Sequence, residues 1–170
     1  MKQTNDITGK NKNIKTESSN GNLNKRITEL ENVRALRELV DNFSILADKK
    51  DVQKQILLFT EDATVESYMN GELTSSLKGI KEIGEAFEGF LANFGAVYHI
   101  NGQHVVSING KEAEGTLYCR VDLISSENGK KINNTSGVSY KDEYIYENGQ
   151  WLIAKRTSNF VWNDRHELSQ

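Results

Sequence analysis

The sequence predicts an α+β fold in which helices gather on one side of an antiparallel sheet. In the first half of the chain, apolar residues recur at steps of three and four, which is typical of amphipathic helices. In the second half, Asn-Gly pairs separate β-rich segments, which is typical of hairpins. The predicted order of elements is helix, helix, strand, helix and four strands.

Three helices are expected. The first spans Thr28–Ala47 and starts with a sequence that fits a capping box, from Thr28 to Glu31. The second and third are predicted over Val52–Phe59 and Leu77–Phe94. The apolar stripe of the first helix consists of Ile27, Leu30, Val33, Leu36, Val40, Phe43 and Leu46.

The strands begin with Ala63–Tyr68, between the second and third helices. Asn-Gly pairs at 109–110, 128–129 and 148–149 then predict hairpins, because this dipeptide favours the positive φ angles of a type I′ turn. A further pair at 101–102 falls inside a strand and indicates a bulge. The strands joined by the hairpins are Tyr98–Ile108, Glu112–Ser125, Asn134–Glu147 and Gln150–Trp162.

Composition restricts the class of protein. With 170 residues, the chain is large enough for one domain, predicted over residues 25–163. Few large apolar residues occur in 1–24, so this tail is expected to be disordered, and residues 164–170 form a polar C-terminal tail. The net charge of −3 argues against a nucleic-acid partner, and no apolar run is long enough to span a membrane. A single cysteine, Cys119, excludes an internal disulfide, and the expected location is cytoplasmic.

The histidines do not indicate a metal site. His99 and His104 lie in one predicted strand but one residue out of phase, so they face opposite sides unless the bulge at 101–102 intervenes. His166 lies in the C-terminal tail. Since no pair of histidines has a metal-ligand spacing with carboxylates on the same face, neither a metal nor another cofactor is expected.

From Leu30 to Trp162 the chain resembles the SnoaL-like branch of the nuclear transport factor 2-like superfamily, which contains scytalone dehydratase and bile-acid dehydratase. The resemblance implies a cone-shaped fold, in which a bent mixed or antiparallel sheet wraps around the N-terminal helices and one deep pocket. The segments that carry it are Ala47–Asp51, Tyr68–Leu73, Tyr98-His99 and the hairpin from Asp142 and Tyr144 to Trp151.

The same resemblance suggests a catalytic set. Asp48 falls on the aspartate of these dehydratases, His99 on their histidine and Tyr68 on a pocket tyrosine. A histidine can take and return a proton near neutral pH, a carboxylate can fix its tautomer, and a tyrosine can donate to an enolate oxygen. This predicts a small-molecule lyase or isomerase acting, without a cofactor, on a hydrophobic oxygenated ring compound such as a polyketide, steroid or terpenoid. A structural histidine and a helix-capping aspartate are the alternative reading.

Departures from the dehydratase pattern leave other functions open. Phe43 and Ala47 stand where the dehydratases have tyrosines, as expected of a binding protein without catalysis. A protein-interaction module is a further alternative, although nothing in the sequence marks a partner surface. Arg120 and Asp122 resemble part of the limonene-epoxide-hydrolase set, although Arg156 is followed by Thr157 where that set needs an aspartate. A homodimer through the outward face of the sheet is expected from related folds. The candidate substrate-binding residues are Phe43, Asn101, Arg120, Asp122, Tyr140 and Asp142.

Overall fold

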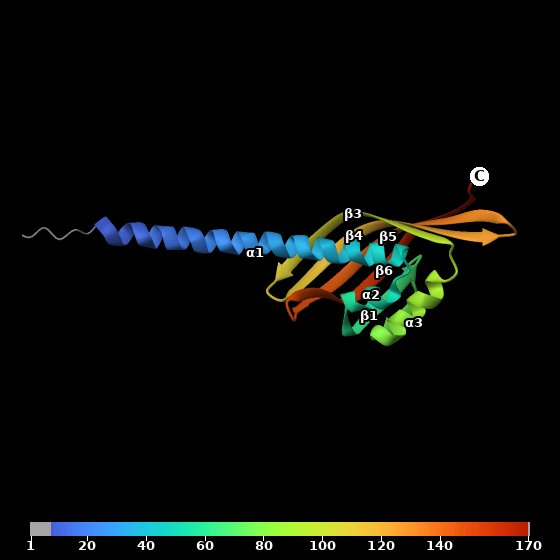
Figure 1. The fold of residues 1–170 in the computed structure, drawn as a ribbon, viewed down its shortest axis with the longest axis horizontal. Coiled ribbons are helices and arrows are strands. Elements are labelled where there is room, and N and C mark those ends of the chain that lie inside the picture. Colours follow the sequence, from blue (N-terminus) through green and yellow to red (C-terminus); the bar gives the residue numbers. More distant parts are fainter. Residues whose placement is uncertain (1–7, 170) are drawn as a thin grey trace, which may run out of the picture. The chain divides into compact units, whose positions relative to one another are not determined.

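The computed structural model describes the backbone of residues 8–169 and the side chains of residues 20–169 (Figure 1). A compact unit begins at Leu36 and contains the end of the first helix and every later element. The elements in chain order are α1 (Thr8–Asp48), α2 (Val52–Gln55), the 3-10 turn η1 (Ile56–Leu58), β1 (Phe59–Met69), β2 (Glu72–Lys78), α3 (Ile80–Leu91), β3 (Ala96–Asn109), β4 (Glu112–Glu127), β5 (Lys130–Glu147) and β6 (Gln150–Glu167).

Helix α1 begins 20 residues before the predicted start at Thr28, so residues 8–24 are helical where the composition predicts disorder. Residues 1–7 of the predicted tail lie outside the described residues. No proline interrupts this stretch, and its lysines favour a helix once later turns are formed. The side chains of residues 20–31 are exposed, so packing does not support this part of the helix.

Rapid amide hydrogen exchange is expected for residues 8–24, because this stretch contains few large apolar residues. A helix without packing is marginal in water, and its hydrogen bonds open easily. The part of α1 from Leu36 to Asp48 serves as an internal control, because Leu36 and Val40 are fully buried. Native-state exchange followed by mass spectrometry should show protection in the control segment only. Equal protection of both segments would show that the composition of the tail is a poor guide to its stability.

The sheet has six strands in the order β2-β1-β6-β5-β4-β3. All neighbours are antiparallel except β1 and β6, which are parallel, so the sheet is mixed and not purely antiparallel. Strand β6 reaches Glu167, which corrects the prediction of a polar tail from residue 164. The residues of β6 beyond position 163 pair with β5: Asp164 lies opposite Thr135, and His166 lies opposite Asn133.

Strand β2 is absent from the sequence prediction. Its residues, ELTSSLK, are mostly polar and mostly exposed at the edge of the sheet, so they give no alternating apolar pattern. Asn70 and Gly71, with φ angles of 53° and 82°, form the turn that joins it to β1. Since β2 ends at Lys78, α3 begins only at Ile80 and not at Leu77.

The predicted bulge in β3 is confirmed. The register between β3 and β4 shifts between Asn101 and His104, so His99 lies opposite Val121 and His104 opposite Leu117. Val121 and Leu117 are both buried residues on the inner face of β4. The bulge thus places both histidines on the same face, where a regular strand would separate them.

The inner face of the sheet and the three helices enclose the core. Phe43 of α1, Phe59 of β1 and Phe87 of α3 meet edge to face, with ring centroids 5.9 to 6.2 Å apart. This aromatic cluster joins α1 and α3 to strand β1. Among the residues that the structure describes, no helix is long and apolar enough to cross a membrane.

Candidate functional site

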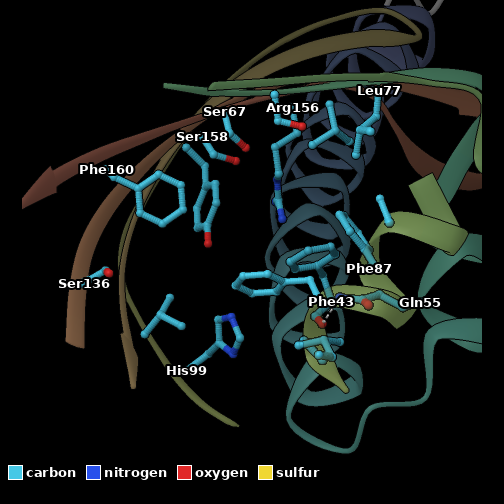
Figure 2. A pocket seen from close by; sticks show the side chains of 18 of the residues that line it. Phe43, Gln55, Ser67, Leu77, Phe87, His99, Ser136, Arg156, Ser158 and Phe160 are labelled. Carbon is cyan, nitrogen blue, oxygen red and sulfur yellow. Dashed lines mark hydrogen bonds between the residues drawn. The ribbon is translucent and has the colours of Figure 1, made fainter. Parts of the chain in front are cut away.

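A cavity of about 420 Å³ lies between the helices and the inner face of the sheet. All three helices and all six strands contribute to its lining, which is mainly apolar. Figure 2 shows His99 and Arg156 pointing from the sheet toward Phe43. A largely apolar cavity with a few convergent polar groups is the usual form of a small-molecule site. The polar lining residues are Gln55, Ser67, Ser75, His99, Ser136, Tyr140, Arg156 and Ser158.

Asp48 and His99 form a close pair at the cavity. His99 Nδ1 lies 2.7 Å from Asp48 Oδ1, and the backbone amide of His99 donates to Asp48 Oδ2 at 3.3 Å. The histidine side chain is only 8% exposed and the aspartate 24%. A carboxylate can only accept, so Nδ1 carries a proton and Nε2 is the basic nitrogen of the neutral ring. The predicted contact between Asp48 and His99 is therefore present.

The end of α1 positions this carboxylate. Asp48 is the last helical residue, and Lys50 follows with a φ angle of 55°. The amides of Lys50 and Asp51 donate to the carbonyls of Ala47 and Leu46, which closes the helix end and turns the chain. Asp51, and not Asp48, caps α2, because its side chain accepts from the Lys54 amide. Asp48 is thus left free to hold the histidine.

Arg156 is a second polar group of the cavity, and it is 1% exposed. Its Nε and Nη2 donate to the two oxygens of Asp142 at 2.9 and 2.6 Å. Its guanidinium lies 4.2 Å from the ring centroid of Phe43 and 4.4 Å from that of Tyr140. Burial tends to lower the pKa of Arg156, but the Asp142 carboxylate outweighs it and raises the pKa above its ordinary value. The guanidinium is therefore a fixed positive charge.

One donor of this guanidinium is unused. Arg156 Nη1 is buried and has no hydrogen-bond partner among the described residues. Tyr140 lies beside it and also lines the cavity. Burial raises the pKa of Tyr140 far above its ordinary value, so its hydroxyl stays protonated and can donate. Arg156 and Tyr140 together offer donors to an oxygen atom in the cavity.

Tyr68 does not join this set. In the parallel pairing of β1 with β6, Tyr68 lies opposite Asn159, whereas Ser67 lies opposite Ser158, which lines the cavity. Side chains alternate between the faces of a strand, so Tyr68 is on the outer face. The expected convergence of Tyr68 with Asp48 and His99 is wrong, and Tyr140 is the tyrosine of the cavity.

Arg120 and Asp122 also lie on the outer face, opposite Ile100 and Tyr98 of β3. Asp122 accepts hydrogen bonds from Arg120, Asn133 and Thr135. Although burial tends to raise it, these hydrogen bonds lower the pKa of Asp122 to about 2. The pair is thus part of an outer-face network. Neither side chain lines the cavity, so Arg120 and Asp122 do not lie where an epoxide-hydrolase-like site would need them.

The other predicted binding residues divide into two groups. Phe43 and Tyr140 line the cavity as expected. Asn101 instead anchors the β3 bulge to α1, donating to the Val40 carbonyl and to Asp41 at 3.2 and 2.9 Å. Asp142 lies behind Arg156 and accepts from Tyr144 at 2.9 Å as well. Asn101 and Asp142 are therefore supporting residues and not part of the lining.

Sequence reasoning missed Gln55 and Arg156 as lining residues. A signal for Arg156 was present, because Arg156, Ser158 and Phe160 alternate along β6 and all line the cavity. Among the side chains of residues 20–169, no group of three histidine, cysteine or acidic residues could hold a metal ion. Cys119 is buried, and burial raises its pKa to about 12, so the thiol stays protonated.

Solved structures with the same fold include several small-molecule enzymes. A protein described as a scytalone dehydratase from Novosphingobium aromaticivorans is 19% identical, with a TM-score of 0.73 over 85% of this chain and 93% of that chain. Hexachlorocyclohexane dehydrochlorinase LinA-type3 from Novosphingobium barchaimii is 16% identical, with a TM-score of 0.69 over 85% and 94%. An NTF2-like protein with a cystatin-like fold from N. aromaticivorans is 21% identical, with a TM-score of 0.65 over 83% and 89%.

At these identities the likeness establishes the fold, an α+β fold of the NTF2 and cystatin-like type. A comparison of the sequence with curated proteins gives no match. The family model of the SnoaL-like domain matches residues 28–157. This range includes Asp48, His99 and Arg156. It also includes strands β1 to β5 in full and the first part of β6. The chain belongs to the SnoaL-like family.

Proposed function

We propose that this protein is a small-molecule lyase or isomerase that works by general acid–base catalysis. The observation that carries the proposal is the Asp48–His99 pair, with 2.7 Å between Oδ1 and Nδ1, at a mainly apolar cavity that also holds Arg156. The family resemblance and the enzymes among the structural neighbours support the same class of reaction.

The chemistry begins with His99 Nε2, which takes a proton from the carbon next to a carbonyl group. Asp48 stabilises the imidazolium that forms and keeps its ring in place. Electrons of the broken C–H bond move onto the carbonyl oxygen, and the enolate accepts hydrogen bonds from Arg156 Nη1 and the Tyr140 hydroxyl. These donors replace the Tyr68 hydroxyl that the sequence suggested.

The second step decides between the two reaction types. In a dehydratase, the enolate re-forms the carbonyl, a C=C bond forms, and the β-hydroxyl leaves as water with the proton returned by His99. In an isomerase, the same proton returns to a different carbon. Both routes restore neutral His99 and need no cofactor. We propose dehydration of a β-hydroxy ketone as the reaction.

The lining favours a hydrophobic ring compound as substrate. Phe43, Phe87, Phe90 and Phe160 all line the cavity, and such aromatic surfaces bind flat or bulky apolar groups. A volume of about 420 Å³ accommodates a polycyclic compound such as a polyketide, steroid or terpenoid. Incubation with cyclic β-hydroxy ketones, followed by ultraviolet absorbance of the conjugated enone, tests the proposal directly. If no enone forms with any of them, the dehydratase assignment is wrong.

A non-catalytic binding protein is the second candidate. It is favoured by Phe43 and Ala47, which leave no tyrosine hydroxyl on this part of α1. The two candidates differ in what His99 and Asp48 contribute. In a binding protein, replacing either residue lowers ligand affinity and no ligand is converted, whereas in the enzyme turnover falls and binding is largely kept.

We further propose a homodimer through the outer face of the sheet. Tyr98, Ile100 and Tyr118 are 50 to 57% exposed, and the β3–β4 register places all three on this face. Such a patch of large apolar side chains favours association. Sedimentation velocity at micromolar concentration should give a dimer, which Tyr118→Glu weakens.

The matched control for the dimer is Leu57→Glu. Leu57 is 65% exposed, but it lies in η1 and not on the sheet, so its replacement should leave the dimer intact. A wild-type monomer would contradict the proposed interface, and dissociation by Leu57→Glu would place the interface elsewhere.

A further inference from the structure

Gln55 is a buried amide that the mechanism does not use. It is the last residue of α2, 1% exposed, and lines the cavity. Its Nε2 donates to the Phe43 carbonyl at 3.2 Å, the hydrogen bond dashed beside Phe43 in Figure 2. Its Oε1 is buried and has no hydrogen-bond partner among the described residues. A buried acceptor in this state costs free energy unless a donor reaches it.

The orientation of this amide is set by its neighbour. A backbone carbonyl can only accept a hydrogen bond, so the nitrogen of Gln55 must face Phe43 and its oxygen must face away. The backbone amide of Gln55 donates to the Asp51 carbonyl at 3.0 Å, which holds the residue in α2. Gln55 thus presents a fixed acceptor at a mainly apolar cavity.

Two buried polar atoms of the cavity residues therefore lack a hydrogen-bond partner, and one is a donor while the other is an acceptor. Arg156 Nη1 is a buried donor that needs an acceptor, and Gln55 Oε1 is a buried acceptor that needs a donor. A ketone oxygen satisfies the first but cannot satisfy the second. A ligand that satisfies both carries an acceptor and a donor, and on an oxygenated ring compound these are a carbonyl oxygen and a hydroxyl group.

We infer that Gln55 selects substrates that carry a hydroxyl group in addition to the carbonyl, so that the substrate class is hydroxylated ring ketones. This inference rests on the proposed function, because it assigns the carbonyl to Arg156. The hydroxyl bound by Gln55 is not the one eliminated. A leaving hydroxyl must gain a proton, whereas Gln55 Oε1 holds a hydroxyl by accepting its hydrogen. The product therefore keeps this hydroxyl group.

Binding to inert probes tests the inference. The probes are 1-indanone, the isomeric indanones with one hydroxyl group on the benzene ring and the methyl ether of each isomer, titrated into the full chain by calorimetry. At least one hydroxy isomer should bind about 10-fold or more tightly than its methyl ether, because the ether leaves Oε1 without a donor. Gln55→Met has similar volume but replaces the amide oxygen with a thioether, a much weaker acceptor, so that preference should disappear while affinity for 1-indanone stays within about twofold.

Two results would overturn the inference: no hydroxy isomer binds more tightly than its ether in the wild type, or the preference persists in Gln55→Met. The wild-type comparison decides by itself if the variant does not fold. Indanones that carry their hydroxyl group on the benzene ring have no β-hydroxyl and cannot undergo the elimination. Their binding is therefore independent of turnover, so that failure of the proposed dehydration and failure of this inference give different results.

Discussion

Replacement of His99 with alanine is expected to lower turnover by about 10²- to 10⁴-fold, the range that general acid–base catalysis usually contributes. Ligand binding should change little, since the cavity is lined mainly by apolar side chains that the substitution leaves in place. Steady-state kinetics on a converted substrate, with a separate binding measurement, distinguishes the two effects. Equal activity of wild type and His99→Ala would refute the mechanism.

The chain offers a matched control for this experiment. His166 Nδ1 lies 3.3 Å from Asp164 Oδ2, so it is also a histidine paired with an aspartate. Both side chains are exposed, at 46% and 67%, and neither lines the cavity. His166→Ala should therefore leave turnover unchanged. A large effect of this control would show that loss of activity reflects general damage to the protein.

Asp48→Asn should reduce turnover less than His99→Ala does. The amide keeps an acceptor near His99 Nδ1 but removes the negative charge that favours the protonated imidazole. Steady-state kinetics of the two variants compares these losses, and a loss for Asp48→Asn as large as that for His99→Ala would contradict the assigned role of Asp48.

The local patterns of the sequence predicted most elements of the fold. Asn-Gly turns located the hairpins, and the pair at 101–102 predicted the bulge that brings His104 to the inner face. Strand β2 could not be found this way, because an exposed polar edge strand has no alternating pattern. The start of α1 was also missed. The sequence of residues 8–27 has neither a clear capping signal nor an apolar stripe that would mark where a helix begins.

The candidate site was predicted in part. The Asp48–His99 contact joins residues 51 positions apart, so only the family resemblance, and not spacing, could suggest it. The error at Tyr68 was avoidable: Val65 and Ser67 share one face of β1, and Tyr68 must lie on the other. The pairing of Arg156 with Asp142 depends on the β5–β6 register, in which the two residues are direct partners, and the sequence does not fix that register.

The ion pair of Arg156 and Asp142 leads to the largest predicted effect on stability. Both side chains are 1% exposed. Asp142→Ala leaves the guanidinium buried without a countercharge and removes the acceptor of the Tyr144 hydroxyl. Loss of one partner of a buried pair typically costs about 3–5 kcal/mol of unfolding free energy. Denaturant unfolding monitored by circular dichroism should show a loss of this size.

Two further variants separate burial of charge from loss of a contact. Glu167→Ala breaks the exposed Lys130–Glu167 pair and should cost about 0–1 kcal/mol, because water already screens those charges. The double variant Asp142→Leu with Arg156→Met removes both buried charges, so it should be more stable than Asp142→Ala alone. Its turnover should nevertheless fall, since Arg156 Nη1, one of the two donors to the enolate oxygen, is gone. If Asp142→Ala were no less stable than Glu167→Ala, the guanidinium would have to reach water, and its role as a buried, fixed charge would fail with it.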